Sequence, residues 1–500
     1  MKFLNKKVII TLIILVFFIL MLIFIPRNKK EDFSEKYSDL QEANHVVDGL
    51  GRSNTYSEYL KVHSDKGYPA KDISIDIGNF NNSRGVEFLS EYESEDNILL
   101  TSNDSFVEWD VFVEDAGMYQ MHISYFPVKS RGVDIERKLY INGEIPFFGA
   151  DALSLTRMWT NKGEVRKDNQ GNDIRPSQVE DPTWTSTYFK DDRGYYSEPY
   201  MFYLEEGMNK IALEVVNEPL AIKNLSFTAV KERIDYSTYK ESLPSNTGSE
   251  LALSYKEVVQ GEDSTLRSAP SLYAIYDRSA PNTEPYSVSK IRLNMIGGNA
   301  YRVPGQWIEW KFKVPEDGVY NITVKGRQNY NRGFVSTRAV YLDGELPFKE
   351  MEQISFKFSN EWESVTLADN EGNPFDFYLT EGEHTIRMEV TLGDLGNILN
   401  DMDESVFRLN EMYRKILVLT GTTPDKYRDY KIDATYPEVI EGMRIESKRL
   451  YKIIDDLVEY SGQKGNQAGT IQTLAEQLEK FVKSPHKIPP SETPKNFLQE

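Results

Sequence analysis

Aromatic residues gather in one polar stretch of the sequence, residues 173–198. It holds Trp184, Tyr188, Tyr195 and Tyr196 among Asp, Arg and Gln residues. Sugar sites in β-proteins combine an aromatic face, which stacks on C–H bonds, with a few polar groups that orient hydroxyls. These four residues are therefore candidates for a saccharide site, together with Trp159 in a neighbouring loop. The alternative is that their rings pack inward as a small separate core.

Two arginines form a second group of candidates. Arg131 and Arg332 each precede a glycine, and Asn329 and Tyr330 lie just before the second arginine. A guanidinium offers a rigid fork of donors that suits a carboxylate or vicinal hydroxyls. The alternative is a salt bridge that holds each loop in place.

Other chemistry has little support in the sequence. Glu262 and Asp263 are weak candidates for a structural Ca²⁺ site, which needs several oxygen ligands from separate segments; no other cofactor is expected. There is no cysteine, the 5 histidines show no metal-ligand spacing, and no G-x-S-x-G or P-loop motif occurs. With 78 acidic residues, a catalytic carboxylate pair cannot be recognised by counting. We therefore expect no enzyme.

Charge and the first residues indicate where the protein works. A net charge of −20 argues against a nucleic-acid partner, because phosphate binding needs clustered Lys and Arg. Residues 8–26 carry no charge and are about as long as one membrane crossing requires. No small-residue cleavage site follows them. We expect a single-pass signal anchor in the cell membrane with an extracytoplasmic body; a cleaved signal peptide is the alternative.

The chain contains an internal repeat. Positions 106–148 align without a gap on 307–349, so that Glu108-Trp109 falls on Glu309-Trp310. Further along, "PYMFYLEEGMNKIALEV" (199–215) matches "PFDFYLTEGEHTIRMEV" (374–390) at a shorter offset. The first copy therefore has an insert between these two blocks, and the chain carries two copies of one domain.

The periodicity of the repeat predicts its fold. Apolar residues alternate from Val107 to Val113, and a Gly-x-Tyr turn follows. Asn142-Gly143 and Asp343-Gly344 are two-residue hairpin turns. The prediction is a mainly β protein with two tandem antiparallel jelly-roll β-sandwiches.

The end of the second copy differs from that of the first. After residue 399 the apolar spacing becomes helical and predicts three helices, the second opening with a capping box at "TYPE" (435–438). We expect the helices to be an insertion in module two and the final strand of that module to be missing; the alternative is that helix packing covers the exposed edge. The expected boundaries are 1–30 anchor, 31–66 linker, 67–235 module one, 236–254 linker, 255–399 module two, 400–484 helices and 485–500 tail.

Two resemblances add to these expectations. The spacing V-x-W-x-V…G-x-Y and G-x-x-x-I-x-L/M-E-V resembles the galactose-binding-like jelly rolls of carbohydrate-binding modules. Residues 168–204 and 260–298 are similar to the N-terminal half of large, family 1-like extracellular solute-binding proteins of sugar ABC transporters. That resemblance implies an oligo- or polysaccharide ligand and ABC permease subunits as partners. The α/β solute-binding domain of those proteins has no counterpart in this sequence, so import cannot be assigned to it.

The function expected from the sequence is thus membrane-anchored carbohydrate binding without catalysis. A cell-envelope scaffolding or protein-interaction role is the alternative. A glycoside hydrolase comes third, because it would need two carboxylates facing each other across a cleft.

Overall fold

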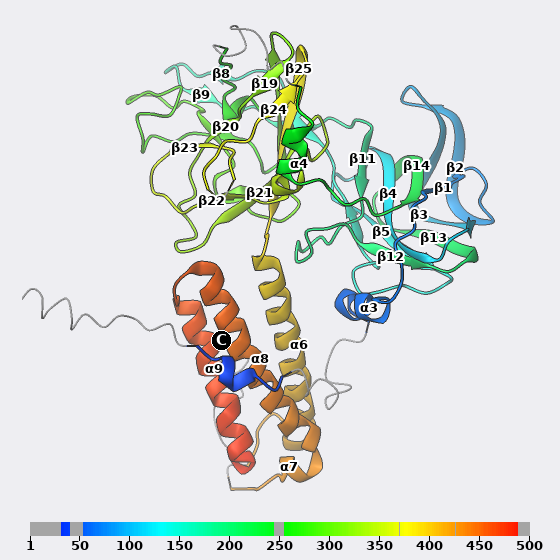
Figure 1. Ribbon diagram of the computed structural model, residues 1–500, viewed down its shortest axis with the longest axis vertical. Helices are drawn as coiled ribbons and strands as arrows, with labels where there is room; N and C mark the ends of the chain where they lie inside the picture. Colours follow the sequence, from blue (N-terminus) through cyan, green and yellow to red (C-terminus); the bar gives the residue numbers. More distant parts are fainter. Residues whose placement is uncertain (1–31, 41–53, 245–254, 370, 426, 489–500) are drawn as a thin grey trace, which may run out of the picture. The chain divides into compact units, whose positions relative to one another are not determined.

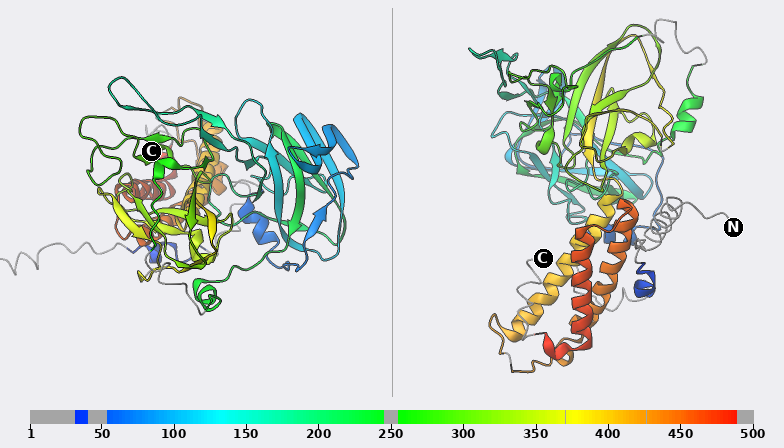
Figure 2. Two further views of the ribbon diagram at one scale, coloured as in Figure 1. Left: turned by 90° about the horizontal axis from the view of Figure 1, so that it is seen from above. Right: turned by 90° about the vertical axis from the view of Figure 1, so that its left-hand side faces the viewer.

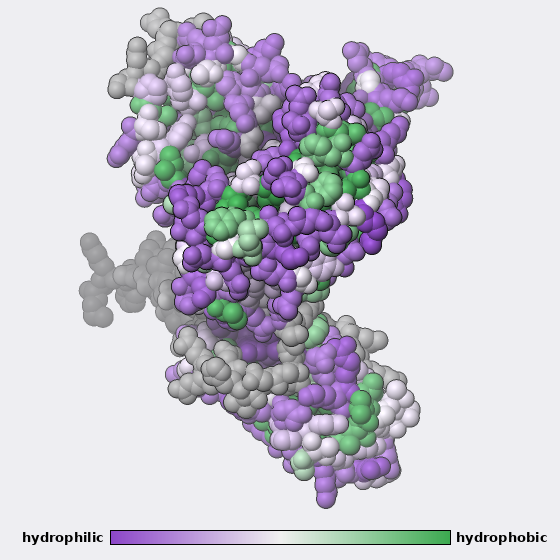
Figure 3. All heavy atoms as spheres, turned by 90° about the vertical axis from the view of Figure 1, so that its right-hand side faces the viewer, coloured by the Kyte–Doolittle hydropathy of each residue, from purple (hydrophilic) through white to green (hydrophobic). Residues whose placement is uncertain are grey.

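The computed structural model describes residues 32–40, 54–244 and 255–488, apart from 370 and 426. The chain divides into two compact units (Figure 1). The sandwich unit comprises residues 52–404, and the helical unit combines residues 405–500 with those before residue 52. Hydrophilic residues cover most of the surface visible in Figure 3, as the net charge of −20 leads one to expect.

Module one is one continuous antiparallel sheet that encloses an apolar core. The strand order is β11-β4-β14-β3-β13-β5-β6, and β1, β2 and β12 pair with β14, β3 and β4. The alternating residues Val107, Trp109, Val111 and Val113 are all buried, as their spacing predicts. The bounds are β1 (Ile73–Ile75), β2 (Asn82–Tyr92), β3 (Glu95–Val113), β4 (Gly117–Pro127), β5 (Ile135–Ile141), β6 (Leu153–Leu155), β11 (Thr185–Tyr188), β12 (Met201–Leu204), β13 (Gly207–Asn217) and β14 (Leu220–Thr228).

Module two repeats the central part of this sheet. The order β18-β25-β21-β22 corresponds to β3-β13-β5-β6. Trp109 lies opposite Ile211, and Trp310 lies opposite Ile386, so the two copies share their register. The bounds are β18 (Trp307–Val314), β19 (Gly318–Tyr320), β20 (Thr323–Gly326), β21 (Ser336–Leu342), β22 (Ile354–Phe356), β23 (Glu363–Thr366), β24 (Phe377–Leu379) and β25 (Gly382–Thr391). Within the described ranges, no strand of module two corresponds to β14.

The two modules share a sheet. Strands β7 (Trp159–Asn161) and β10 (Gln178–Glu180) of module one extend the sheet of module two through β15 (Leu266–Arg267). Arg267 is fully buried there and donates to Asn161 at 2.9 Å and to Gln178 at 2.5 Å. Module one is therefore incomplete as an isolated fragment. Four two-stranded pairs complete the described strands: β8 (Arg166–Lys167) with β9 (Asp173–Ile174), β16 (Ala274–Ile275) with β17 (Met295–Ile296), β19 with β24, and β20 with β23. The sandwich unit also holds the short 3₁₀ turns η2 (Gly261–Asp263), η3 (Gly298–Ala300) and η4 (Lys349–Glu352).

A short helix precedes each sandwich inside the stretches expected to be linkers. Helix α3 (Tyr56–Val62) packs on module one, and α4 (Tyr236–Glu241) packs on module two. Tyr56 Oη accepts a hydrogen bond from Met201 N at 2.9 Å, and Tyr236 Oη accepts one from Asp376 N at 2.9 Å. The repeated domain is therefore a helix followed by a sandwich.

The helical unit contains three long helices that run side by side (Figure 2). They are α6 (Leu395–Thr420), whose first ten residues belong to the sandwich unit, α8 (Pro437–Ser461) and α9 (Asn466–Lys483), with the short α7 (Ile432–Thr435) and η5 (Pro485–Lys487). Leu409, Leu450, Ile454 and Leu478 are buried, which confirms the predicted helical segment. The capping box is wrong: Thr435 ends α7 and its hydroxyl donates to Lys431 O, while Pro437 opens α8 without a side-chain cap.

A segment near the start of the chain packs on the helical unit. Helix α2 (Ser34–Tyr37) follows Phe33, whose ring lies 4.8 Å from that of Tyr451. Phe33 N donates to Asp455 at 2.8 Å. The predicted anchor at 8–26 lies outside the described residues. Among the helices that the structure describes, none is both long enough and apolar enough to cross a membrane.

Candidate functional site

The structure separates the five aromatic candidates into two groups. Trp184 packs on Phe126 at 5.5 Å and donates its indole N–H to Glu93 O at 3.1 Å. Tyr188 packs on His122 at 5.0 Å, and Trp159 lies in β7, where it pairs with β10 and β15. All three are partly buried and serve packing. Tyr195 and Tyr196 instead line a cavity.

The carboxylate of Asp191 fixes the position of these two tyrosines. It accepts hydrogen bonds from Tyr195 N at 2.7 Å, from Tyr196 N at 3.3 Å and from the Tyr200 hydroxyl at 3.0 Å. A short Asp side chain that binds the backbone ahead of it stabilises a tight turn. Gly194, at φ +71°, completes this turn and lies against Pro304, so a larger residue would not fit.

The cavity lies wholly within the sandwich unit and has a volume of about 160 Å³. Four segments far apart in the sequence form its walls: residues 55–57 before and within α3, 148–152 in module one, 191–200 in the insert and 400–404 in α6. One water needs roughly 10–15 Å³ by this measure, so the cavity has room for a small ring.

Tyrosine rings form one wall. Tyr56 lies 4.8 Å from Tyr196 and 4.7 Å from Tyr200, both in edge-on arrangements. Tyr56 and Tyr200 are buried, whereas Tyr195 and Tyr196 keep part of their surface exposed. Burial raises the pKa of Tyr196 to about 12, so its hydroxyl stays protonated and can donate or accept.

Acidic side chains outnumber basic ones in the lining of the cavity. Asp151, Asp191, Asp192, Asp403 and Glu404 line it, with Arg193 as the cation of the lining. Arg193 is engaged by Asp403 at 3.0 Å and lies over the Phe148 ring at 5.3 Å. The Asp192 side chain is exposed, yet partial desolvation, followed by the neighbouring charge of Asp191, raises the pKa of its carboxyl group above the usual range.

Among the described residues, the equivalent region of module two is lined differently. Phe375 stands where module one has Tyr200, and its ring packs on Tyr236 at 4.6 Å. The insert that carries Asp191 and Tyr196 is absent from the second copy. The cavity is therefore a feature of module one.

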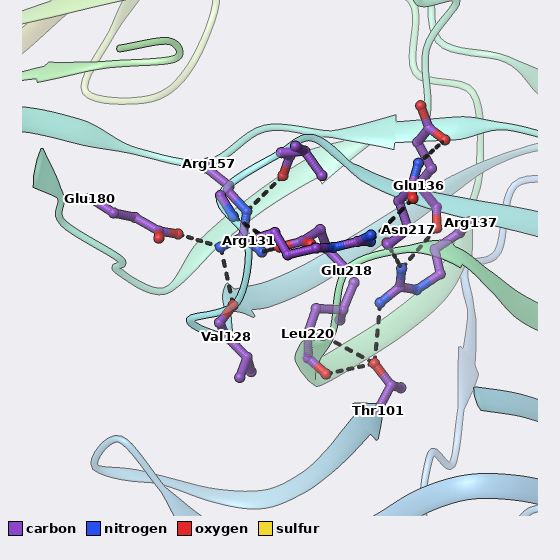
Figure 4. Close-up of polar contacts among 12 residues, drawn as sticks. Thr101, Val128, Arg131, Glu136, Arg137, Arg157, Glu180, Asn217, Glu218 and Leu220 are labelled. Atoms are coloured by element: carbon purple, nitrogen blue, oxygen red, sulfur yellow. Dashed lines mark hydrogen bonds and ion pairs between the residues drawn. The ribbon is translucent and has the colours of Figure 1, made fainter. Parts of the chain in front are cut away.

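The arginine candidates differ between the modules. Arg131 Nε donates to Glu218 at 2.9 Å, and Glu218 also pairs with the buried Arg157 at 2.6 Å (Figure 4). The salt-bridge alternative is thus the one found for Arg131. Module two has Gly393 at the position of Glu218, and both residues have positive φ, +55° and +62°. Arg332 is exposed and has no ion-pair partner in the part of the chain that the structure describes.

The loop around Arg332 is nevertheless ordered by its own side chains. Gln328 accepts hydrogen bonds from Tyr330 N and Asn331 N at 3.1 Å, and it donates to Phe334 O at 3.0 Å. Asn329 is exposed, and Tyr330 keeps 66% of its surface exposed. These residues do not lie among the cavity-lining residues.

The acids proposed for calcium are close to each other in η2. Burial raises the pKa of Glu262 to about 7. Among the described residues, no group of three or more His, Asp or Glu side chains is arranged to hold a metal. The calcium site stays a prediction.

Sequence reasoning missed part of the cavity. Tyr56, Asp191, Arg193, Asn400 and Asp403 were not among its candidates. A signal did exist for the first: "YSEY" (56–59) and "YSTY" (236–239) each follow a capping Thr or Asp, which marks a repeated helix. No spacing rule brings residues 191–200 to residues 400–404.

The last hundred or so residues of the chain are similar to a known family of domains. Residues 397–493 match the family described as "Bacterial solute-binding protein, 4-helix bundle domain". No curated protein is similar to the chain at a significant level.

Solved structures similar to the chain include three carbohydrate-binding modules. One is the CBM35 from Cellvibrio japonicus Abf62, 15% identical over 32% of this chain and 95% of that chain, with a TM-score of 0.20. Another is a family 35 module from Clostridium thermocellum, which is 12% identical over 32% of this chain and 100% of that chain, with a TM-score of 0.19. The third is the C-terminal CBM6 of LamC, a laminarinase of Zobellia galactanivorans, which is 12% identical over 32% of this chain and 99% of that chain, with a TM-score of 0.19. At these low TM-scores, the architecture described above rests on the strand order and register of the chain itself.

Proposed function

We propose that the chain is a non-catalytic carbohydrate-binding protein of the outer cell surface, and that the cavity of module one is its saccharide site. The observation that carries the proposal is the meeting of Tyr195 and Tyr196 with Asn400 and several carboxylates around a ring-sized space. Saccharide sites combine aromatic surface with a few oriented polar groups. The match of residues 397–493 to a domain of bacterial solute-binding proteins supports a role beside a sugar ABC transporter.

The test is binding of oligosaccharides to the full-length chain in detergent. We expect retention of some members of a glycan array, and loss of that retention in Tyr196→Ala, because this ring forms the partly exposed wall of the cavity. Tyr427→Ala is the matched control, since Tyr427 is 98% exposed on the helical unit. Equal retention by Tyr196→Ala and the unaltered chain would contradict the site. No retention at all would favour the scaffolding alternative.

Membrane attachment is part of the same proposal and has its own test. Residues 8–26 supply the apolar length, and the acidic body suits the outside of the cell. The full-length chain should stay with membranes at high salt and be released by detergent. A soluble chain that lacks these residues would indicate the cleaved signal peptide instead. Permease subunits remain proposed partners.

A glycoside hydrolase is a further candidate, behind scaffolding, because several carboxylates line the cavity and the pKa of one of them, Asp192, is raised. Retaining and inverting hydrolases need one acid and one base or nucleophile across the glycosidic bond. Asp191 is occupied by hydrogen bonds from its own turn, which favours a structural role. We expect no new reducing ends when the chain is incubated with the glycans that it retains.

A further inference from the structure

The cavity presents mostly acceptors of hydrogen bonds. Its one guanidinium, Arg193, already pairs with Asp403 and lies over Phe148. Asp192 adds an exposed carboxyl group, and Asn400 and the tyrosine hydroxyls can act in either direction.

Such a lining discriminates by the sign of the ligand. A carboxylate or sulfate on a sugar would need donors, and it would meet carboxylates and an arginine that is already used. Hydroxyl and amino groups, in contrast, can donate to the carboxyl and hydroxyl oxygens of the wall. An acid group on the ligand would lie beside like charges and would lack hydrogen-bond donors, and both effects cost binding free energy.

We infer that the cavity of module one takes a sugar ring bearing hydroxyl or amino groups and excludes rings that carry an acid group. This inference rests on the proposed saccharide site and specifies its ligand class. The raised pKa of Asp192 is in accord with it, because partial desolvation and the neighbouring charge of Asp191 disfavour negative charge even at this exposed carboxyl group.

The loop of Arg332 offers the contrasting chemistry within one chain. Its exposed guanidinium lacks the carboxylate that Arg131 finds in Glu218. Any retention of acidic sugars by the chain should therefore depend on Arg332 and not on the cavity. This separation lets one experiment assign each class of ligand to its site.

The experiment uses the full-length chain and three families on one glycan array: neutral oligosaccharides such as cellotriose, glucosamine oligomers and galacturonic acid oligomers. Retained glycans are then titrated by calorimetry. We expect Tyr196→Ala to abolish retention of neutral or amino glycans, and acid glycans to bind at least tenfold more weakly at the cavity. Arg332→Ala should remove any remaining retention of acid glycans.

The charge itself is tested by Asp192→Asn, which keeps the shape of the side chain. We expect this variant to lower the ratio of amino to acid glycan affinity by about threefold or more, with Glu87→Gln, on the exposed β2, as the control. Glu404→Gln provides a second substitution in the lining should Asp192→Asn fold poorly. If acid glycans bind as tightly as neutral ones and their binding depends on Tyr196, this inference is wrong, but the saccharide site still stands. Failure of every family to bind would overturn the saccharide site as well.

Discussion

Lys190 and Glu389 join the two sandwiches, with Lys190 Nζ 3.2 Å from Glu389 Oε1. The same ammonium donates to the Tyr341 hydroxyl at 3.0 Å. Lys190 belongs to the insert of module one, whereas Glu389 and Tyr341 lie on β25 and β21 of module two. Despite burial, which acts against the charge, Glu389 and Tyr341 raise the pKa of Lys190 above its usual range.

Lys190→Met should therefore destabilise the sandwich unit. Hydrogen bonds to charged groups contribute about 1.5–3 kcal/mol to stability. The Glu389 side chain is only 16% exposed, and without Lys190 its carboxylate would lose this partner. A fall in the unfolding temperature of the full-length chain is the measurement, and Lys190→Met/Glu389→Gln should recover part of it. Lys311→Met is the control, because the Lys311–Glu383 pair is about half exposed and should contribute less than about 1 kcal/mol.

Glu218 should be far more sensitive than Arg131. The Glu218 carboxylate is fully buried and holds Arg157, whose side chain is only 1% exposed. Glu218→Ala leaves that guanidinium with Glu180 and nearby carbonyls, and we expect a loss of about 3–5 kcal/mol in the free energy of unfolding. Arg131 is 64% exposed, so Arg131→Ala should change it by less than about 1 kcal/mol. Chemical denaturation of both variants is the check; equal losses would contradict this account.

The stability of module two should fall as pH rises because of Glu262. Its folded-state pKa is raised from 4.5 to about 7 by burial, so the folded state holds the proton more tightly than the unfolded state. The stabilisation is complete below about pH 4.5, decreases between about 4.5 and 7, and is absent above that range. Glu262→Gln should remove this dependence and be more stable than the unaltered chain at pH 8 by up to about 3 kcal/mol. The measurement is the difference in unfolding free energy between the two proteins across pH 4–8.

Calcium gives the opposite expectation for the same residue. A bound cation would favour the ionised carboxylate and would stabilise the unaltered chain at pH 8. A rise in unfolding temperature on addition of CaCl₂ that is lost in Glu262→Gln would support the calcium prediction. No rise would set it aside.

The repeated tyrosine helices offer a pair of variants that separates stability from binding. Tyr56→Phe and Tyr236→Phe each remove the hydroxyl that accepts a backbone N–H, from Met201 and Asp376 respectively. Each should cost about 1 kcal/mol of stability. Only Tyr56 lines the cavity, so only Tyr56→Phe should also weaken glycan binding in calorimetry. Equal binding losses in the two variants would indicate an indirect effect of stability.

The repeat and the strand periodicity made the architecture predictable. Val107 to Val113 alternate along one strand, and the second copy places Trp310 at the same register as Trp109. The apolar spacing of α8 and α9 likewise predicted their helices, since packing of an amphipathic face determines such segments. Local patterns of this kind need no knowledge of distant residues.

The shared sheet and the cavity could not be predicted in the same way. Trp159 pairs with Arg267, and Arg193 pairs with Asp403, across large separations in sequence. Arg137 is a further example: its buried guanidinium donates to Asn217 O and Thr101 Oγ1, which lie far from it in the sequence. Burial lowers its pKa to about 9. These partners are determined by the tertiary structure, so they cannot be predicted from the residue pattern of a single segment.

The composition of the cavity wall has a consequence for the chain as a whole. Residues 55–57 open the sandwich unit after the stretch that follows α2, and residues 400–404 continue through α6 into the helical unit. The first and the last described residues of the sandwich unit thus border the same space. A molecule seated there would restrain both ends of this unit together, and hydrogen exchange of residues 55–60 and 397–404 should slow in concert when it arrives.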